Sequence, residues 1–326
     1  MLRCVLPLKL IVAAAAITIP AVALARNDGT RRACDKVVSP RGSVAKLANS
    51  LRPGQTGCLR AGVYRHNVKI RRGGRPGAPT TIRSFPGERA TVRGRLYVTN
   101  SANHVVIRLL FLDGRNRARL PSPTVNGNNV VFRDNDVTTR HTTICFLLGS
   151  DEYGRARHTV IERNRIHDCG QLPPTNHHHG IYVEASDGAR ITDNWIYDNA
   201  DRGVQLFPDA QRTYVARNVI DGNGEGVVFA RKSANNLVEN NVISNPVVRY
   251  NVEDFELDGA GNVARRNCLW SARHAGNAAI SPEIEVQVSE NLVTDPAFAN
   301  RDAKDFRLGP ESLCAKFSPG SRRPGP

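Results

Sequence analysis

A six-residue pattern recurs along the middle of the chain: an apolar residue, two polar residues, Asn, any residue and a second apolar residue. It occurs as FRDNDV, IERNRI, ITDNWI, VARNVI and VSENLV, with VENNVI and ARRNCL as weaker variants. The repeated asparagines are Asn135, Asn164, Asn194, Asn218, Asn241, Asn267 and Asn291, at spacings of 29, 30, 24, 23, 26 and 24 residues. A repeat of this length with short β-rich segments is typical of one coil of a parallel β-solenoid.

A second pattern, Gly followed by alternating apolar residues, recurs every 23 residues as GIYV, GVQL and GVVF from Gly180, Gly203 and Gly226. Such alternation fits a strand with one buried face. The predicted inward residues, which should stack about 4.8 Å apart in neighbouring coils, are Ile181, Val183, Val204, Leu206, Val227 and Phe229. We expect the asparagines to form hydrogen bonds along the solenoid axis and to satisfy backbone groups at a bend, which is a structural role.

The two longest spacings between the asparagines indicate insertions, one around residues 149–158 and the other at residues 171–179. Insertions in solenoid proteins usually lie on one face, and that face is often the binding face. We therefore expect both segments to flank a binding site.

The repeats resemble the right-handed parallel β-helix proteins of the pectate-lyase-like superfamily. Residues 51–94 add to this, because their Pro53-Gly54, Gly62-Val63-Tyr64, Gly77-Ala78-Pro79 and Phe85-Pro86-Gly87 turns resemble the opening coils of secreted polysaccharide lyases of the chondroitinase-B and alginate-lyase group. The resemblance implies an all-β fold, a single-stranded right-handed parallel β-helix with an N-terminal cap. The superfamily contains lyases, hydrolases, epimerases and non-catalytic adhesins, so the resemblance is specific for fold and not for activity.

The sequence divides into four regions. Residues 1–25 read as an export signal, with Arg3 and Lys9 before an apolar run and Ala23-Leu24-Ala25 as the cleavage site. Residues 26–60 form the predicted cap, with a short helix at residues 44–51, and residues 61–310 form the β-helix. Residues 311–326 are a tail that we expect to be partly disordered. No later stretch of about 18 apolar residues follows, which predicts a soluble mature protein without a membrane span. We expect this protein to be secreted and monomeric.

Six cysteines remain after removal of the predicted signal, and an even number in an exported chain favours disulfide bonds. Six cysteines allow fifteen connectivities. Pairing of sequence neighbours gives Cys34 with Cys58, Cys145 with Cys169 and Cys268 with Cys314. No zinc-ligand spacing occurs among these residues.

The net charge of +15 is unevenly distributed. Residues 26–140 carry 23 Lys and Arg against 6 Asp and Glu, whereas residues 141–326 carry 20 against 24. The basic front half indicates a polyanionic partner, or else a bias toward arginine in the coding sequence. The resemblance to polysaccharide lyases implies that this partner is an acidic polysaccharide. Nucleic acid is not expected, because aromatic residues make up only 6% and none is interleaved with the basic runs as a stacking platform would be.

Cleavage of a uronate polymer by β-elimination needs a group that neutralises the carboxylate, a base for the C5 proton and an acid for the leaving oxygen. The repeat register predicts that His179, Arg202 and Glu225 form one outward column on three coils. Arg202 is the candidate neutralising group, because a guanidinium binds a carboxylate through two hydrogen bonds. The candidate base is His179 or Lys232, and Tyr182 is the candidate acid.

Other residues of the 177–232 segment complete the predicted site. His177 is a further catalytic or binding candidate, and Gln205, Arg231 and Glu225 are candidates for substrate binding. Glu184 and Asp201 are candidate Ca²⁺ ligands, since carboxylate oxygens suit this ion and a bound cation would also neutralise the substrate carboxylate. The resembling lyases use a Lys/Arg pair near acidic Ca²⁺ ligands, and Arg231-Lys232 is the one such pair on a repeat.

The leading hypothesis is therefore a secreted lyase that acts on acidic polysaccharide. One alternative is a non-catalytic polysaccharide-binding or cell-surface β-helix protein. Another is a glycoside hydrolase or a uronate C5-epimerase. A hydrolase needs two carboxylates about 5 to 9.5 Å apart, and Asp201 with Glu225 or Asp198 with Asp221 are the candidate pairs.

Overall fold

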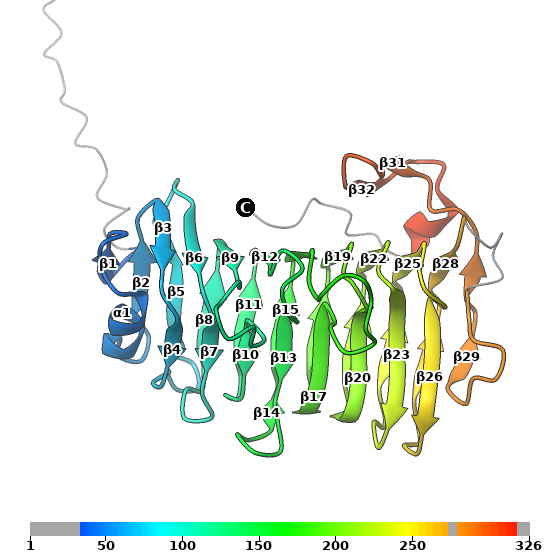
Figure 1. The fold of residues 1–326 in the computed structure, drawn as a ribbon, viewed down its shortest axis with the longest axis horizontal. Coiled ribbons are helices and arrows are strands. Elements are labelled where there is room, and N and C mark those ends of the chain that lie inside the picture. Colours follow the sequence, from blue (N-terminus) through cyan, green and yellow to red (C-terminus); the bar gives the residue numbers. More distant parts are fainter. Residues whose placement is uncertain (1–32, 273–278, 318–326) are drawn as a thin grey trace, which may run out of the picture.

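The computed structural model describes residues 33–272 and 279–317, which wind into an elongated stack of coils (Figure 1). Each regular coil contributes one strand to each of three parallel sheets that run along the stack, and the coils at the two ends lack some of these strands. The predicted all-β parallel β-helix is confirmed. The predicted export signal at residues 1–25 lies outside the described residues, as do residues 318–326 of the predicted tail.

The three sheets are named A, B and C below. Sheet A consists of β1 (Lys36–Val38), β2 (Thr56–Leu59), β5 (Thr80–Ser84), β8 (Val105–Arg108), β11 (Val131–Arg133), β15 (Val160–Glu162), β18 (Arg190–Thr192), β21 (Tyr214–Ala216), β24 (Leu237–Glu239), β27 (Val263–Arg265) and β29 (Gln287–Ser289). Sheet B consists of β3 (Gly62–Arg65), β6 (Ala90–Arg93), β9 (Leu110–Asp113), β12 (Asp136–Thr138), β16 (Arg165–His167), β19 (Trp195–Tyr197), β22 (Val219–Asp221), β25 (Val242–Ser244), β28 (Cys268–Trp270) and β30 (Leu292–Val293). Sheet C consists of β4 (Val68–Ile70), β7 (Leu96–Val98), β10 (Thr124–Val125), β13 (Phe146–Leu148), β17 (Ile181–Asp187), β20 (Arg202–Gln211), β23 (Glu225–Arg231) and β26 (Val252–Leu257), with β14 (Ala156–Arg157) beside β17.

The predicted core residues of sheet C stack as expected. Ile181 pairs with Val204 and Val204 with Val227, and the same register joins Val183, Leu206 and Phe229. All six side chains are fully buried. Glycine precedes each of these stacks because the backbone passes close to the next coil. A Cβ on Gly226 would lie 2.2 Å from the carbonyl oxygen of Asn251, closer than van der Waals contact allows.

The asparagine repeat forms a continuous ladder at the bend between sheets A and B. Asn218 Oδ1 accepts hydrogen bonds of 2.9 Å from both the backbone N–H and the side-chain amide of Asn194. Its own amide donates to the carbonyl oxygen of Ile191 at 2.8 Å. The same side-chain contact joins all seven predicted asparagines in order. The residue before each asparagine has a positive φ, as at Asp193 with 59°, so the predicted structural role at a bend is confirmed.

The ends of the stack differ from the regular coils. Helix α1 (Val44–Ser50) lies at the N-terminal end, close to the prediction of residues 44–51, and the Ser43 hydroxyl accepts from the Lys46 N–H at its start (Figure 1). Near the other end, β31 (Phe298–Asn300) and β32 (Asp305–Leu308) form an antiparallel hairpin, followed by the 3-10 helix η2 (Leu313–Lys316). Phe306 of this hairpin packs on Trp195 and Tyr197 of sheet B.

Three disulfide bonds join Cys34 to Cys58, Cys145 to Cys169 and Cys268 to Cys314. These are the pairs of sequence neighbours, so that prediction is confirmed. Within residues 33–272 and 279–317 no helix has the length and apolar character needed to cross a membrane.

Candidate functional site

One column of side chains runs along the outer face of sheet C. Strand register places its members side by side in the order Lys69, Tyr97, Thr124, Leu147, Tyr182, Gln205, Val228 and Glu253. Seven steps of strand spacing give the column a length of roughly 34 Å. Both insertions line pockets over this face, the first through residues 150–153 and the second through residues 174–179. The prediction that the insertions share one face is confirmed.

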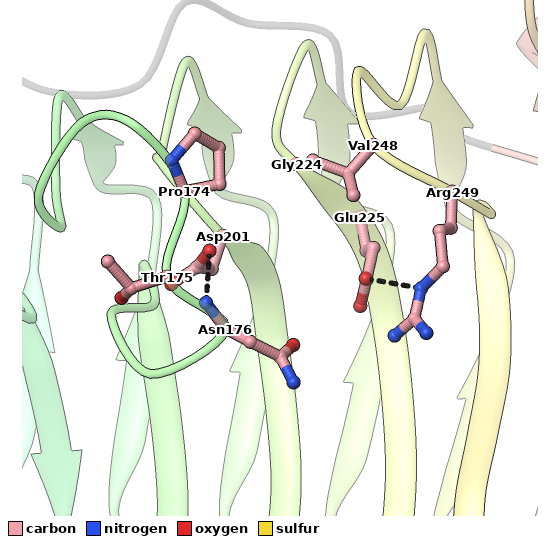
Figure 2. Close-up of a pocket in the computed structure, with 8 residues that line it drawn as sticks. All are labelled: Pro174, Thr175, Asn176, Asp201, Gly224, Glu225, Val248 and Arg249. Atoms are coloured by element: carbon pink, nitrogen blue, oxygen red, sulfur yellow. Dashed lines mark hydrogen bonds and ion pairs between the residues drawn. The ribbon is translucent and has the colours of Figure 1, made fainter.

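Two neighbouring pockets lie beside the second insertion. The histidine pocket, with a volume of about 260 Å³, is lined by Asn176, His177, His179, Tyr182, Arg202, Gln205, Phe207, Ala230 and Phe255. The glutamate pocket, of about 330 Å³, is lined by Pro174, Thr175, Asn176, Asp201, Gly224, Glu225, Val248 and Arg249 (Figure 2). The histidine pocket thus gathers five of the residues predicted for catalysis or substrate binding.

Asp201 fixes the insertion over these pockets. Its carboxylate accepts hydrogen bonds from the backbone N–H groups of Asn176, His177 and His178 at 2.9, 2.9 and 2.6 Å. Figure 2 shows the first of these bonds at the foot of the loop. Asp201 directly precedes β20, and from this position its side chain can accept hydrogen bonds from three consecutive backbone N–H groups.

The predicted column of His179, Arg202 and Glu225 exists, but the prediction that its side chains are solvent-facing is wrong. The three residues are only 4%, 6% and 4% exposed. Arg202 donates to Glu225 Oε2 at 2.8 Å and to the carbonyl oxygen of Asn176 at 3.1 Å. The second insertion thus contacts Arg202 through Asn176, and Arg249 donates to Glu225 Oε1 at 2.9 Å (Figure 2). The sequence analysis expected Arg202 to be exposed and free, whereas it is buried and paired. The error arose because repeat spacing carries no information on which residues a loop covers.

The ion-pair cluster extends to Glu253, which the sequence prediction missed. The guanidinium of Arg249 lies 3.2 Å from Glu253 Oε1, and Glu253 Oε2 is buried with no hydrogen-bond partner among residues 33–272 and 279–317. Burial, with a smaller contribution from the negative charge of Glu225, raises the pKa of Glu253 to about 7, against the opposing effect of Arg249. The sequence contained a signal for Glu253, because Val252 continues the inward column of Val227 and Glu253 follows it directly. This coil was overlooked because it has Asn in place of the repeated Gly.

His179 and Tyr182 meet within the histidine pocket, with ring centroids 5.3 Å apart in an edge-to-face arrangement. Burial, together with the positive charge of Arg202, lowers the pKa of His179 well below its ordinary value of 6.5. Burial also raises the pKa of Tyr182 above its ordinary value of 10. Across neutral pH the pocket therefore presents a neutral imidazole and a protonated phenol, which are a base and an acid.

Two polar atoms of this pocket are buried without a hydrogen-bond partner in the described part of the chain: His179 Nδ1 and Gln205 Oε1. An unpaired buried polar atom costs about 1–3 kcal/mol, so such atoms mark a place where a ligand group or water is expected. Both belong to side chains that line the pocket.

Other predicted residues lie apart from this pocket. Arg231 and Lys232 are exposed at the opposite end of β23, where Arg231 pairs with Glu256, and neither lines the histidine or the glutamate pocket. Glu184 and Asp201 line different pockets. Among the residues with described positions, no group of three or more His, Cys, Asp or Glu is arranged to hold a metal ion. The Ca²⁺ site stays a prediction.

Comparison with known proteins agrees with this architecture. A family model for the right handed beta helix region matches residues 124–278. The structure of pectate lyase Pel9A superimposes with a TM-score of 0.58 at 12% identity, covering 86% of this chain and 90% of that one. The chain has the pectate-lyase-like right-handed β-helix fold. The structure of XylC in complex with xylose is also similar, with a TM-score of 0.58 and 12% identity, covering 75% of this chain and 66% of that one. An alginate lyase from Paenibacillus sp. has 15% identity and a TM-score of 0.46, covering 79% of this chain and 99% of that one. No curated protein matches the sequence.

Proposed function

We propose that this β-helix protein is exported and cleaves an acidic polysaccharide by β-elimination in the histidine pocket. The observation that carries the proposal is the buried, neutral His179 beside the protonated Tyr182, with unpaired polar atoms of His179 and Gln205 in the same pocket. Three disulfide bonds support an extracytoplasmic location, where acidic polysaccharides occur. The fold is one that a pectate lyase also uses.

In this mechanism His179 takes the proton from C5 of a uronate residue while the bond between C4 and the glycosidic oxygen breaks. A double bond forms between C4 and C5, and the Tyr182 hydroxyl protonates the departing oxygen. The proton held by His179 returns to Tyr182 through solvent, so both groups are restored and no redox partner is needed. A neutral imidazole suits the first step, because a protonated one cannot accept the C5 proton.

Neutralisation of the substrate carboxylate falls to the arginine cluster as a whole. Arg202 lines the pocket, but Glu225 pairs with it, and Arg249 is shared by Glu225 and Glu253. When Glu253 is protonated, two arginines face one carboxylate and the cluster carries one net positive charge. The raised pKa of Glu253 makes this state well populated near neutral pH.

The hydrolase alternative is not favoured, because the carboxylates of both candidate pairs are already engaged in hydrogen bonds or ion pairs within the protein. Asp201 is occupied by three backbone donors, and Glu225 by two arginines. In the other pair, Asp221 bonds to Arg301, Ser244 and Asn245, and Asp198 pairs with Lys304. The non-catalytic binding alternative is favoured by one observation: Arg202 is already paired to Glu225 and is less available to a substrate carboxylate.

The test is a screen of several polyuronates with the purified protein, in which ultraviolet absorbance reports new unsaturated chain ends. We expect absorbance to rise on at least one polyuronate and the rise to vanish in His179→Ala and Tyr182→Phe. Binding of the polymers without any rise in absorbance would refute the lyase proposal and leave the binding function.

A further inference from the structure

A third pocket, the tyrosine pocket, lies on the outer face of sheet C toward the N-terminal end. It has a volume of about 630 Å³ and extends over β4, β7, β10, β13 and β17, with the first insertion as one wall. The side chains that matter here are Lys69, Arg95, Tyr97, Asn126, Glu152 and Tyr153. Glu184 of β17 also lines it, two residues after Tyr182 of the histidine pocket, so the two pockets adjoin along one strand.

Two cations of this pocket flank one aromatic ring. The Arg95 guanidinium carbon lies 4.9 Å from the centre of the Tyr97 ring, and Lys69 Nζ lies 5.4 Å from it. Within residues 33–272 and 279–317 neither cation has a carboxylate within ion-pair distance. Some other arginines of the basic half do have such partners, as Arg93 has in Asp113 and Arg133 in Glu162. The charges of Arg95 and Lys69 are thus available to a ligand.

Unsatisfied polar atoms mark the same pocket. Arg95 Nε is buried without a partner, while its NH2 group donates to Thr124 Oγ1 at 3.3 Å. Asn126 is only 2% exposed; its amide donates to the carbonyl oxygen of Gly154, but its Oδ1 has no partner in the described part of the chain. The pocket therefore offers free donors with positive charge and a free acceptor, beside an aromatic face.

We propose that the tyrosine pocket is a recognition site for one uronate residue of an acidic polysaccharide. The carboxylate binds Arg95 and Lys69, because a guanidinium fork matches a planar carboxylate and an ammonium adds charge. The sugar ring lies against the exposed Tyr153 or Tyr97. A sugar hydroxyl donates to Asn126 Oδ1, and further hydroxyls donate to Glu152.

This site performs recognition and not cleavage, so it goes beyond the proposed elimination and does not depend on it. Arg202 of the histidine pocket is paired to Glu225, whereas Arg95 and Lys69 have no carboxylate partner among the residues with described positions. Tyr97 and Tyr182 belong to the same register column, three strand steps or roughly 14 Å apart. A polysaccharide that lies along sheet C would reach both pockets at once.

The experiment is calorimetric titration of the disulfide-intact protein with a uronate hexasaccharide, a neutral hexasaccharide and a sulfated neutral hexasaccharide. His179→Ala serves as the background, so that the ligand is not cleaved. We expect the uronate to bind at least about tenfold more tightly than the other two, the value of one charge-assisted contact. Arg95→Gln and Lys69→Gln should each remove about that factor.

Arg190→Gln is the matched control, because Arg190 lies 4.8 Å from the centre of the Tyr214 ring, but on sheet A. It should leave the affinity unchanged. Equal affinity for neutral or sulfated sugar, or unchanged binding by both Arg95→Gln and Lys69→Gln, would overturn the proposal. Loss of elimination activity with retained Arg95-dependent binding would sink only the lyase function, so the two failures are distinguishable.

Discussion

The histidine pocket and the tyrosine pocket lie on one sheet and share one column of side chains, yet they differ in whether their cations are paired with carboxylates. In and beside the first, Arg202 and Arg249 are paired internally with Glu225 and Glu253. In the second, Arg95 and Lys69 have no carboxylate partner within the described residues. Arg95 is half-buried and Lys69 is exposed, so neither requires an internal partner and both charges stay open to an anionic ligand. The comparison suggests chemistry by neutral groups in one pocket and recognition by charge in the other.

The largest expected effect concerns the base. His179→Ala should lower the elimination rate by about 10²–10⁴-fold, the usual contribution of a general base. Wild-type activity should be level across neutral pH and fall only below 6.5, because the pKa of His179 is lowered by burial. Steady-state rates measured from pH 4 to 9 check both points. A wild-type elimination rate in His179→Ala would contradict the assignment of catalysis to the histidine pocket and of recognition to the tyrosine pocket.

The next effect concerns the paired arginine. Arg202→Ala should reduce the free energy of unfolding by about 3 kcal/mol, because it removes one partner of a buried ion pair. Arg190→Ala removes an arginine of sheet A that has no ion-pair partner within the described residues, and should change stability by less than about 0.5 kcal/mol. Urea unfolding of both variants provides the measurement. Equal stability of the two would show that the cluster in the histidine and glutamate pockets is not held by internal pairing.

A smaller effect is expected away from both pockets. Asn218→Ala removes the acceptor of two ladder bonds from Asn194 and should cost about 1–3 kcal/mol of stability. It should leave both uronate binding and elimination at their wild-type values at temperatures where the variant is folded. Thermal melting and the two functional assays, run side by side, test this. A functional defect without a shift in melting temperature would argue against a purely structural ladder.

The smallest effect is a change in pH dependence. The pKa of Glu253 is raised to about 7 from an ordinary 4.5, so the folded protein holds a proton that the unfolded chain has lost between these values. Glu253 therefore stabilises the fold at low pH, and this contribution is lost as the pH rises from 4.5 through 7. Glu253→Gln should flatten that part of the stability profile. An unchanged slope in urea unfolding at pH 5, 6 and 7 would contradict the assignment.

Repetition explains how much of the fold could be predicted from the sequence. The bend asparagines and the inward residues of sheet C each follow from a spacing that the solenoid geometry repeats. The disulfide pairs follow from the pairing of sequence neighbours. The sequence analysis missed shorter ladders at other bends, such as Asn199 with Asn223 and Asn236 with Asn262. These recur over too few coils to stand out as a pattern.

The candidate site could be predicted only in part, because it depends on non-repeating segments. Register placed His179, Tyr182, Arg202 and Gln205 together, and the structure brings them to one pocket. The repeat register could not show that residues 171–179 fold over the column or that Arg249 contacts Glu225. The tyrosine pocket was missed because β4, β7, β10 and β13 lie before the first Gly repeat at Gly180, so their register in sheet C was not readable from that pattern.

The closing hairpin β31–β32 has a mechanical consequence. A linear stack of coils ordinarily frays from its ends, since each coil is held only by its neighbours. Here Arg301 reaches Asp221 and Phe306 packs on Trp195, while Cys314 is bonded to Cys268. The segment thus links several coils to one another, so the C-terminal coils cannot unfold one at a time. The strands under the histidine pocket would be released only together with those that flank them, which keeps the spacing of its side chains fixed.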